Sequence, residues 1–101
     1  MAYLGGALDA TIAAAAGGDE ELYRELRGAF IDSAERQLDL MRRARCDGNW
    51  RIAALRLKGL ATSFHDEALG ELADEAADGA PSEPTVLRRI ARHVEQLAII
   101  V

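Results

Sequence analysis

The stretch ALRLKGLATSF, residues 54–64, carries an apolar repeat on one helix face and a glycine on the opposite side. The apolar stripe begins just before this stretch and has steps of four and three: Trp50, Ala54, Leu57, Ala61 and Phe64. At about 100° per residue, Leu55 and Gly59 fall roughly 140° and 180° away from that stripe. A glycine in a helix interior costs about 1 kcal/mol relative to alanine. The stretch therefore raises the question of what Gly59 provides on a face turned away from the core.

The outward face of this helix predicts a docking surface. Ile52 lies near Leu55 on that side, and exposed apolar side chains that gather in one place often mark an interaction site. Gly59 beside them would let another molecule approach the helix backbone closely. The predicted partner-binding residues are Ile52, Leu55, Arg56, Lys58, Gly59 and Thr62. The alternative interpretation is that Gly59 only allows a neighbouring helix of the same chain to pack.

Helical patterns also precede the quoted stretch. A first segment carries Leu4, Leu8 and Ile12 and stops at the paired glycines 17–18, which suit the end of a helix. Asp19 is then predicted to be the N-cap of a long second helix. The apolar stripe of that second helix is Leu22, Leu26, Phe30, Ala34, Leu38, Met41 and Ala44. The first part of the chain is therefore predicted to form one short and one long helix.

Two more helices are predicted after the one that starts near Asn49 and runs to about His65. Asp66 is expected to cap a fourth helix, and Pro84 suits the first turn of a fifth. The residues expected to be buried in these two helices are Leu69, Leu72, Ala73, Ala76, Leu87, Ile90, Val94, Leu97 and Val101. Because short loops favour antiparallel neighbours, the sequence predicts one all-α domain, residues 1–101. Its expected architecture is an antiparallel four-helix bundle with a short additional N-terminal helix.

The charge balance and the cysteine content argue against several classes of protein. Twelve Lys and Arg against 17 Asp and Glu give a net charge of −5, which argues against a nucleic-acid binder and against binding to an anionic membrane surface. No apolar run approaches the roughly 20 residues of a membrane span. Cys46 is the only cysteine, so no intramolecular disulfide is possible. These features, with no basic stretch after Met1, predict a cytoplasmic protein.

The stretch CDGNWRIAALRLKGLATSFHDEALGELADEA, residues 46–76, resembles the centre of a histidine phosphotransfer (HPt) domain. That family carries a motif of the form Ala-His-x-Leu-Lys-Gly, and Ala54, Leu57, Lys58 and Gly59 match it. The order of the predicted helices also matches, so the resemblance covers nearly the whole chain. It implies a signalling module that binds a receiver domain of a response regulator or hybrid histidine kinase in a two-component phosphorelay. The abundant Ala and Arg would suit a GC-rich bacterial genome.

Leu55 stands where the family has its phosphorylated histidine. That imidazole accepts a phosphoryl group from the aspartate of a receiver domain, whereas leucine has no lone pair to accept it. The resemblance therefore implies a module that binds receivers but has lost phosphotransfer, and so is no enzyme and needs no cofactor. It also implies that Lys58 lies near the phosphoryl group and that Gly59 lets the receiver approach. A second departure is His65, where the family often has glycine.

Two other functions remain open from the sequence. The first is a phosphotransfer protein that uses another residue, although His65 and His93 are both expected to be ordinary surface or capping histidines. The second is a homo-oligomer, such as a homodimer through the Leu55 surface or through residues 99–101. No metal site is expected, because the adjacent residues 65–67 point their side chains in different directions along a helix.

Overall fold

The computed structural model describes residues 6–99, which contain five α-helices and no strand. In chain order these are α1 (Gly6–Ala16), α2 (Glu20–Arg43), α3 (Asp47–Phe64), α4 (Glu67–Asp78) and α5 (Pro84–Ile99). The predicted all-α class is confirmed, with α3 beginning at Asp47 rather than near Asn49. The expected core residues Leu4 and Val101 lie outside the described residues. Within 6–99, none of the helices combines the length and the apolar character that crossing a membrane requires.

Local signals account for the helix ends. The side chain of Asp19 accepts hydrogen bonds from two backbone N–H groups in the first turn of α2. Gly17 and Gly18 before it have φ values of 60° and 89°, in the left-handed region that favours glycine. Asp66 caps α4 in the same way, because its Oδ1 accepts from the backbone N–H of Leu69 at 3.1 Å. Both predicted N-caps are confirmed.

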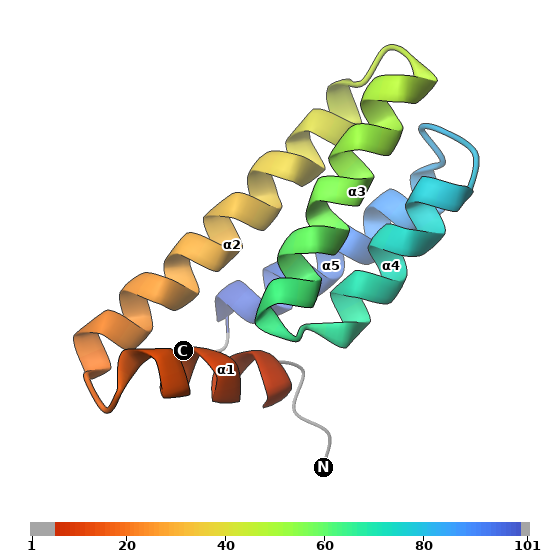
Figure 1. The fold of residues 1–101 in the computed structure, drawn as a ribbon. Coiled ribbons are helices and arrows are strands. Elements are labelled where there is room, and N and C mark those ends of the chain that lie inside the picture. The colour runs from red at the N-terminus through yellow and green to blue at the C-terminus, as the bar shows by residue number, and fades with distance from the viewer. Residues whose placement is uncertain (1–5, 100–101) are drawn as a thin grey trace.

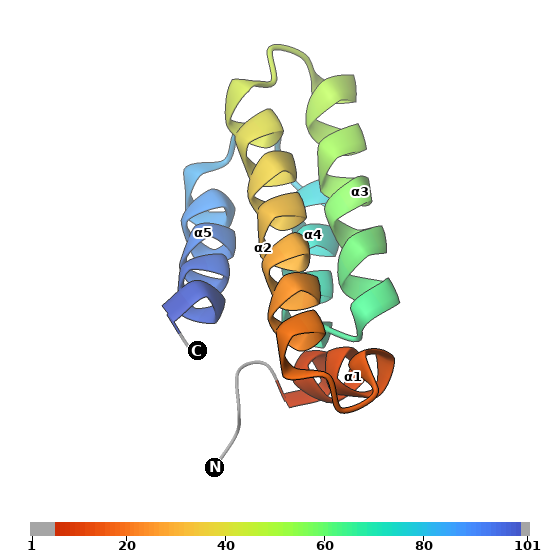
Figure 2. The same ribbon diagram turned by 90° about the vertical axis from the view of Figure 1, so that its left-hand side faces the viewer.

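Helices α2, α3, α4 and α5 run side by side, each antiparallel to the next along the chain (Figure 1). α2 packs against α3 and α5, and α4 packs against the same two helices, so the four enclose one core. α1 lies across one end, where it contacts α2 and α3 (Figure 2). One side of α3 therefore faces the core, while the opposite side is exposed.

The core combines a few large side chains with many alanines. Trp50 and Phe30 are almost fully buried, and the ring centroids of Phe30 and Phe64 lie 5.0 Å apart. The alanines of the core are Ala34, Ala53, Ala54, Ala61, Ala73, Ala76 and Ala77. The predicted core face of α3 is confirmed, with Phe64 half-buried at its end. Other predicted core residues are only half-buried and pack against the core, namely Leu26, Ala44, Leu72 and Leu87, whereas Val86, which is not among the predicted residues, is buried.

The start of α3 supports the end of α4. The indole Nε1 of Trp50 donates to the carbonyl oxygen of Ala76 at 2.8 Å, and a guanidinium nitrogen of Arg51 donates to that of Ala77 at 2.9 Å. Both carbonyls lie in the last turn of α4, where backbone acceptors have no partner within their own helix. These two hydrogen bonds fix α3 against α4 and so hold the outward face of α3 in place.

A polar contact joins α1 to α2. Asp9 in α1 accepts hydrogen bonds from the hydroxyl of Tyr23 at 3.0 Å and from Nε of Arg27 at 3.1 Å. Burial, with the hydrogen bond to Asp9, raises the pKa of Tyr23 above its ordinary value of 10.0. Leu22, predicted to face the core, is exposed, because α1 covers the side of α2 that carries Tyr23 and Arg27. The prediction for Leu22 is therefore wrong.

Candidate functional site: the outward face of α3

Two large apolar side chains of α3 point to solvent. Ile52 is 49% exposed and Leu55 is 42% exposed, while Ala54 and Leu57 are buried. Residues three apart on a helix lie on neighbouring turns of the same face, so Ile52 and Leu55 form one apolar surface. Their predicted outward orientation is confirmed. A partner molecule could therefore reach Leu55 without any change in the packing of the helices.

Gly59 leaves the backbone of α3 bare one turn after Leu55. A Cβ atom placed at Gly59 would meet no neighbouring atom within 4 Å. No helix within residues 6–99 covers this position, so the alternative interpretation, that Gly59 lets a helix of the same chain pack closely, is wrong for the described part of the chain. What the glycine offers is access to the helix backbone from outside.

Lys58 lies on the flank of α3 that faces α4. Its Nζ donates to Oδ1 of Asp74 at 2.8 Å, and both side chains are about half exposed. The hydrogen bond and the negative charge of Asp74 raise the pKa of Lys58 above its ordinary value of 10.5. The ammonium group is therefore held by α4 and not directed at the space above Leu55. Asp74 is absent from the predicted site, because its pairing depends on how α4 packs against α3.

The predicted partner-binding residues lie in three places: on the exposed ridge of α3, in the groove between α3 and α2, and in the groove between α3 and α4. Leu55 lies on the ridge, followed by the bare backbone of the next turn. Ile52 and Arg56 line a groove of about 370 Å³ between α2 and α3. Lys58 and Thr62 line a second groove of about 370 Å³ between α3 and α4. The structure thus brings all the predicted residues to one side of α3, but not onto a single flat patch.

Leu40 of α2 belongs to the same surface and is missing from the predicted set. Its side chain is 41% exposed and lines the groove between α2 and α3 together with Ile52. The sequence carries a signal for it, because Leu40 falls outside the apolar stripe that contains Leu38 and Met41. An exposed leucine beside a predicted docking helix is informative only once the packing of the two helices is known.

His65 ends α3 in an unusual backbone conformation. Its φ of 62° lies in the left-handed region, where glycine is favoured. Its backbone N–H bonds the carbonyl oxygen of Thr62, and its ring Nδ1 lies 3.0 Å from Oγ1 of Thr11 in α1. The expectation of a capping histidine is confirmed.

His93 is buried, so the expectation of an ordinary surface or capping histidine is wrong. Only 6% of the residue is exposed, and its Nε2 lies 2.8 Å from Oδ2 of the buried cap residue Asp66. The physical reason is its place in α5, three residues after Ile90 and four before Leu97, both of which face the core. That spacing was available in the sequence.

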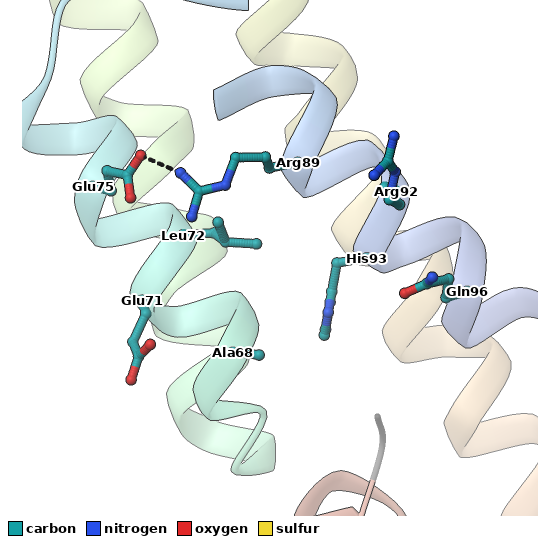
Figure 3. A pocket seen from close by; sticks show the side chains of 8 residues that line it. All are labelled: Ala68, Glu71, Leu72, Glu75, Arg89, Arg92, His93 and Gln96. Atoms are coloured by element: carbon teal, nitrogen blue, oxygen red, sulfur yellow. Dashed lines mark hydrogen bonds and ion pairs between the residues drawn. The ribbon is translucent and has the colours of Figure 1, made fainter. Parts of the chain in front are cut away.

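The ring of His93 also lines a pocket of about 390 Å³ between α4 and α5 (Figure 3). Arg89 and Glu75 form an ion pair of 2.6 Å in this pocket. A phosphorylated receiver would have to reach His93 between these two helices. The arrangement of His93 therefore favours a structural role over that of a phosphate acceptor.

Neither metal chemistry nor a known relative accounts for the site. Among residues 6–99, no group of three or more His, Cys, Asp and Glu side chains is placed to hold a metal ion. Comparison with protein families, with curated proteins and with solved structures finds no match to this chain.

Proposed function

We propose that this chain is an HPt-like four-helix bundle, with α1 as an additional N-terminal helix, that binds a receiver domain through the outward face of α3 without accepting its phosphoryl group. The observation that carries the proposal is the exposure of Leu55, at the position of the family's histidine, beside the open backbone of Gly59. The side-by-side arrangement of α2 to α5 supports the same interpretation (Figure 1).

The chemistry of Leu55 separates binding from transfer. Its side chain offers apolar area that a partner can bury, but it has no atom that can attack a phosphorus centre. The phosphoryl group of a docked receiver would stay on the receiver's aspartate. The module would then act by occupying the receiver and excluding other partners, or by joining the receiver to another protein.

The proposal is tested by mixing the chain with the receiver domains of the same organism. We expect at least one receiver to bind in isothermal titration calorimetry, and no ³²P label to pass from the phosphorylated receiver to the chain. Leu55→Asp should weaken binding at least about tenfold, as loss of a central apolar contact does. Leu22→Asp is the matched control. Leu22 is also an exposed leucine, but it lies in the first turn of α2, at the opposite end of that helix from Leu40.

Two outcomes would overturn this function. Acid-labile phosphate on the wild-type chain, lost on His65→Gln or His93→Gln, would show a phosphotransfer protein that uses another residue. A homodimer in sedimentation that buries Leu55 and binds no receiver would show an oligomerisation module.

The variant Leu55→His restores a histidine at the position of the family's phosphate acceptor. It should fold normally because the site is exposed. Its acceptance of phosphate from a receiver is compared with that of Leu22→His, which places a histidine at another exposed leucine.

A further inference from the structure

Charge is strongly segregated along this chain. Residues 36–58, which cover the last eight residues of α2, the following turn and most of α3, contain seven basic and two acidic residues, a net charge of +5. The remaining residues contain five basic and 15 acidic ones, a net charge of −10. An overall net charge of −5 therefore hides one basic segment of the chain, residues 36–58, called the basic end below; two of its cations, Arg51 and Lys58, pair with Asp78 and Asp74 of α4.

The apolar groove between α2 and α3 lies within this basic end. Leu40 and Ile52 line it, and Leu55 follows Ile52 by one turn of α3. Arg43 and Arg56 also line it, and both are exposed. Arg43 forms an exposed ion pair with Asp39 of α2 at 2.7 Å, whereas Arg56 forms no ion pair within residues 6–99. The groove thus combines apolar side chains with positive charge at its edge.

We propose that the groove between α2 and α3 receives an amphipathic helix of a partner protein, whose apolar stripe is flanked by acidic side chains. The stripe would cover Leu40 and Ile52, and its flanking carboxylates would meet Arg43 and Arg56. The acidic remainder of the molecule repels such a helix from other surfaces, so that charge selects this groove. The inference rests on the proposed function in that it names the chemistry of the receiver segment that docks here.

The probe is a synthetic helical peptide of 18 residues with a leucine stripe and glutamates on both flanks. We expect it to shift amide resonances of the groove residues in the ¹⁵N-labelled full chain, with a Kd that rises steeply with salt because exposed charges are screened. The same peptide with lysines in place of the glutamates should not bind. The double variant Arg43→Glu/Arg56→Glu should weaken binding of the glutamate peptide about tenfold or more.

Arg24→Glu is paired with the single variant Arg56→Glu, since both change the net charge equally and Arg24 is an exposed arginine outside the basic end. If Arg24→Glu weakens binding as much as Arg56→Glu, or if the lysine peptide binds as well as the glutamate peptide, the inference is wrong. Tighter binding of a 20-base-pair DNA duplex or of anionic vesicles than of the glutamate peptide would also overturn it.

The inference and the proposed function fail separately. Peptide binding in the groove, with no receiver domain bound, would contradict the receiver function and leave the groove inference standing. A receiver that binds the chain but is unaffected by Arg43→Glu/Arg56→Glu would support the function and overturn the inference.

Discussion

Asp66 makes two contacts, and its replacement by alanine should therefore cost more than the loss of an ordinary helix cap. Its side chain caps α4 through the N–H of Leu69 and pairs with the buried ring of His93 at 2.8 Å. Loss of an N-cap costs about 1 kcal/mol. A buried polar group left without its partner costs about 1–3 kcal/mol more. We therefore expect Asp66→Ala to lower the free energy of unfolding by about 3 kcal/mol.

Asp19→Ala is the matched control, because Asp19 also caps a helix but is exposed and has no buried partner. It should cost about 1 kcal/mol. Urea unfolding followed by circular dichroism measures both losses. At about 4–8 °C per kcal/mol for a domain near this size, Asp66→Ala should also lower Tm by roughly 12–24 °C.

A double-mutant cycle isolates the pair itself. If the contact between Asp66 and His93 stabilises the fold, Asp66→Ala and His93→Leu should be non-additive by at least about 1 kcal/mol. Equal losses for Asp66→Ala and Asp19→Ala, together with additive effects in the cycle, would refute the reasoning.

Three further predictions concern other contacts. Gly59→Ala should raise the free energy of unfolding by about 0.5–1 kcal/mol in urea denaturation, because the site is helical and open. Trp50→Phe should lower it by about 2 kcal/mol in the same assay, because the carbonyl oxygen of Ala76 loses its buried donor. The raised pKa of Tyr23 means that the folded state holds its hydroxyl proton more tightly than the unfolded state. The stabilisation should therefore be complete below pH 10 and decline as the pH rises through the folded pKa, while Asp9→Asn should lower the spectrophotometric titration midpoint of Tyr23.

Local signals in the sequence were sufficient for the helices and their ends. Asp19 and Asp66 cap helices through N–H groups two or three residues away, and a contact of that range can be read directly from the order of residues. The outward direction of Leu55 follows from helical geometry alone. These features do not depend on how the helices pack against one another.

The buried polar contacts depend on that packing, so the order of residues does not reveal them. His93 meets Asp66 across 27 positions of the chain, and Arg27 meets Asp9 across 18. Arg27 is a charged residue on a helix face that sequence patterns treat as solvent-exposed, and only the position of α1 buries it. The spacing of His93 from Ile90 and Leu97 is enough to place it on the core side of α5, although the prediction for it was a surface or capping histidine. No periodicity identifies which carboxylate it meets.

Trp50 is the only tryptophan of the chain, and its almost complete burial makes it a selective optical reporter. Its indole lies on the inner side of the helix whose outer side carries Leu55. A ligand on the outer side would leave the emission maximum unchanged, whereas loss of the native packing would shift it to the red. Intrinsic fluorescence can therefore distinguish variants that lose a partner from variants that lose the fold.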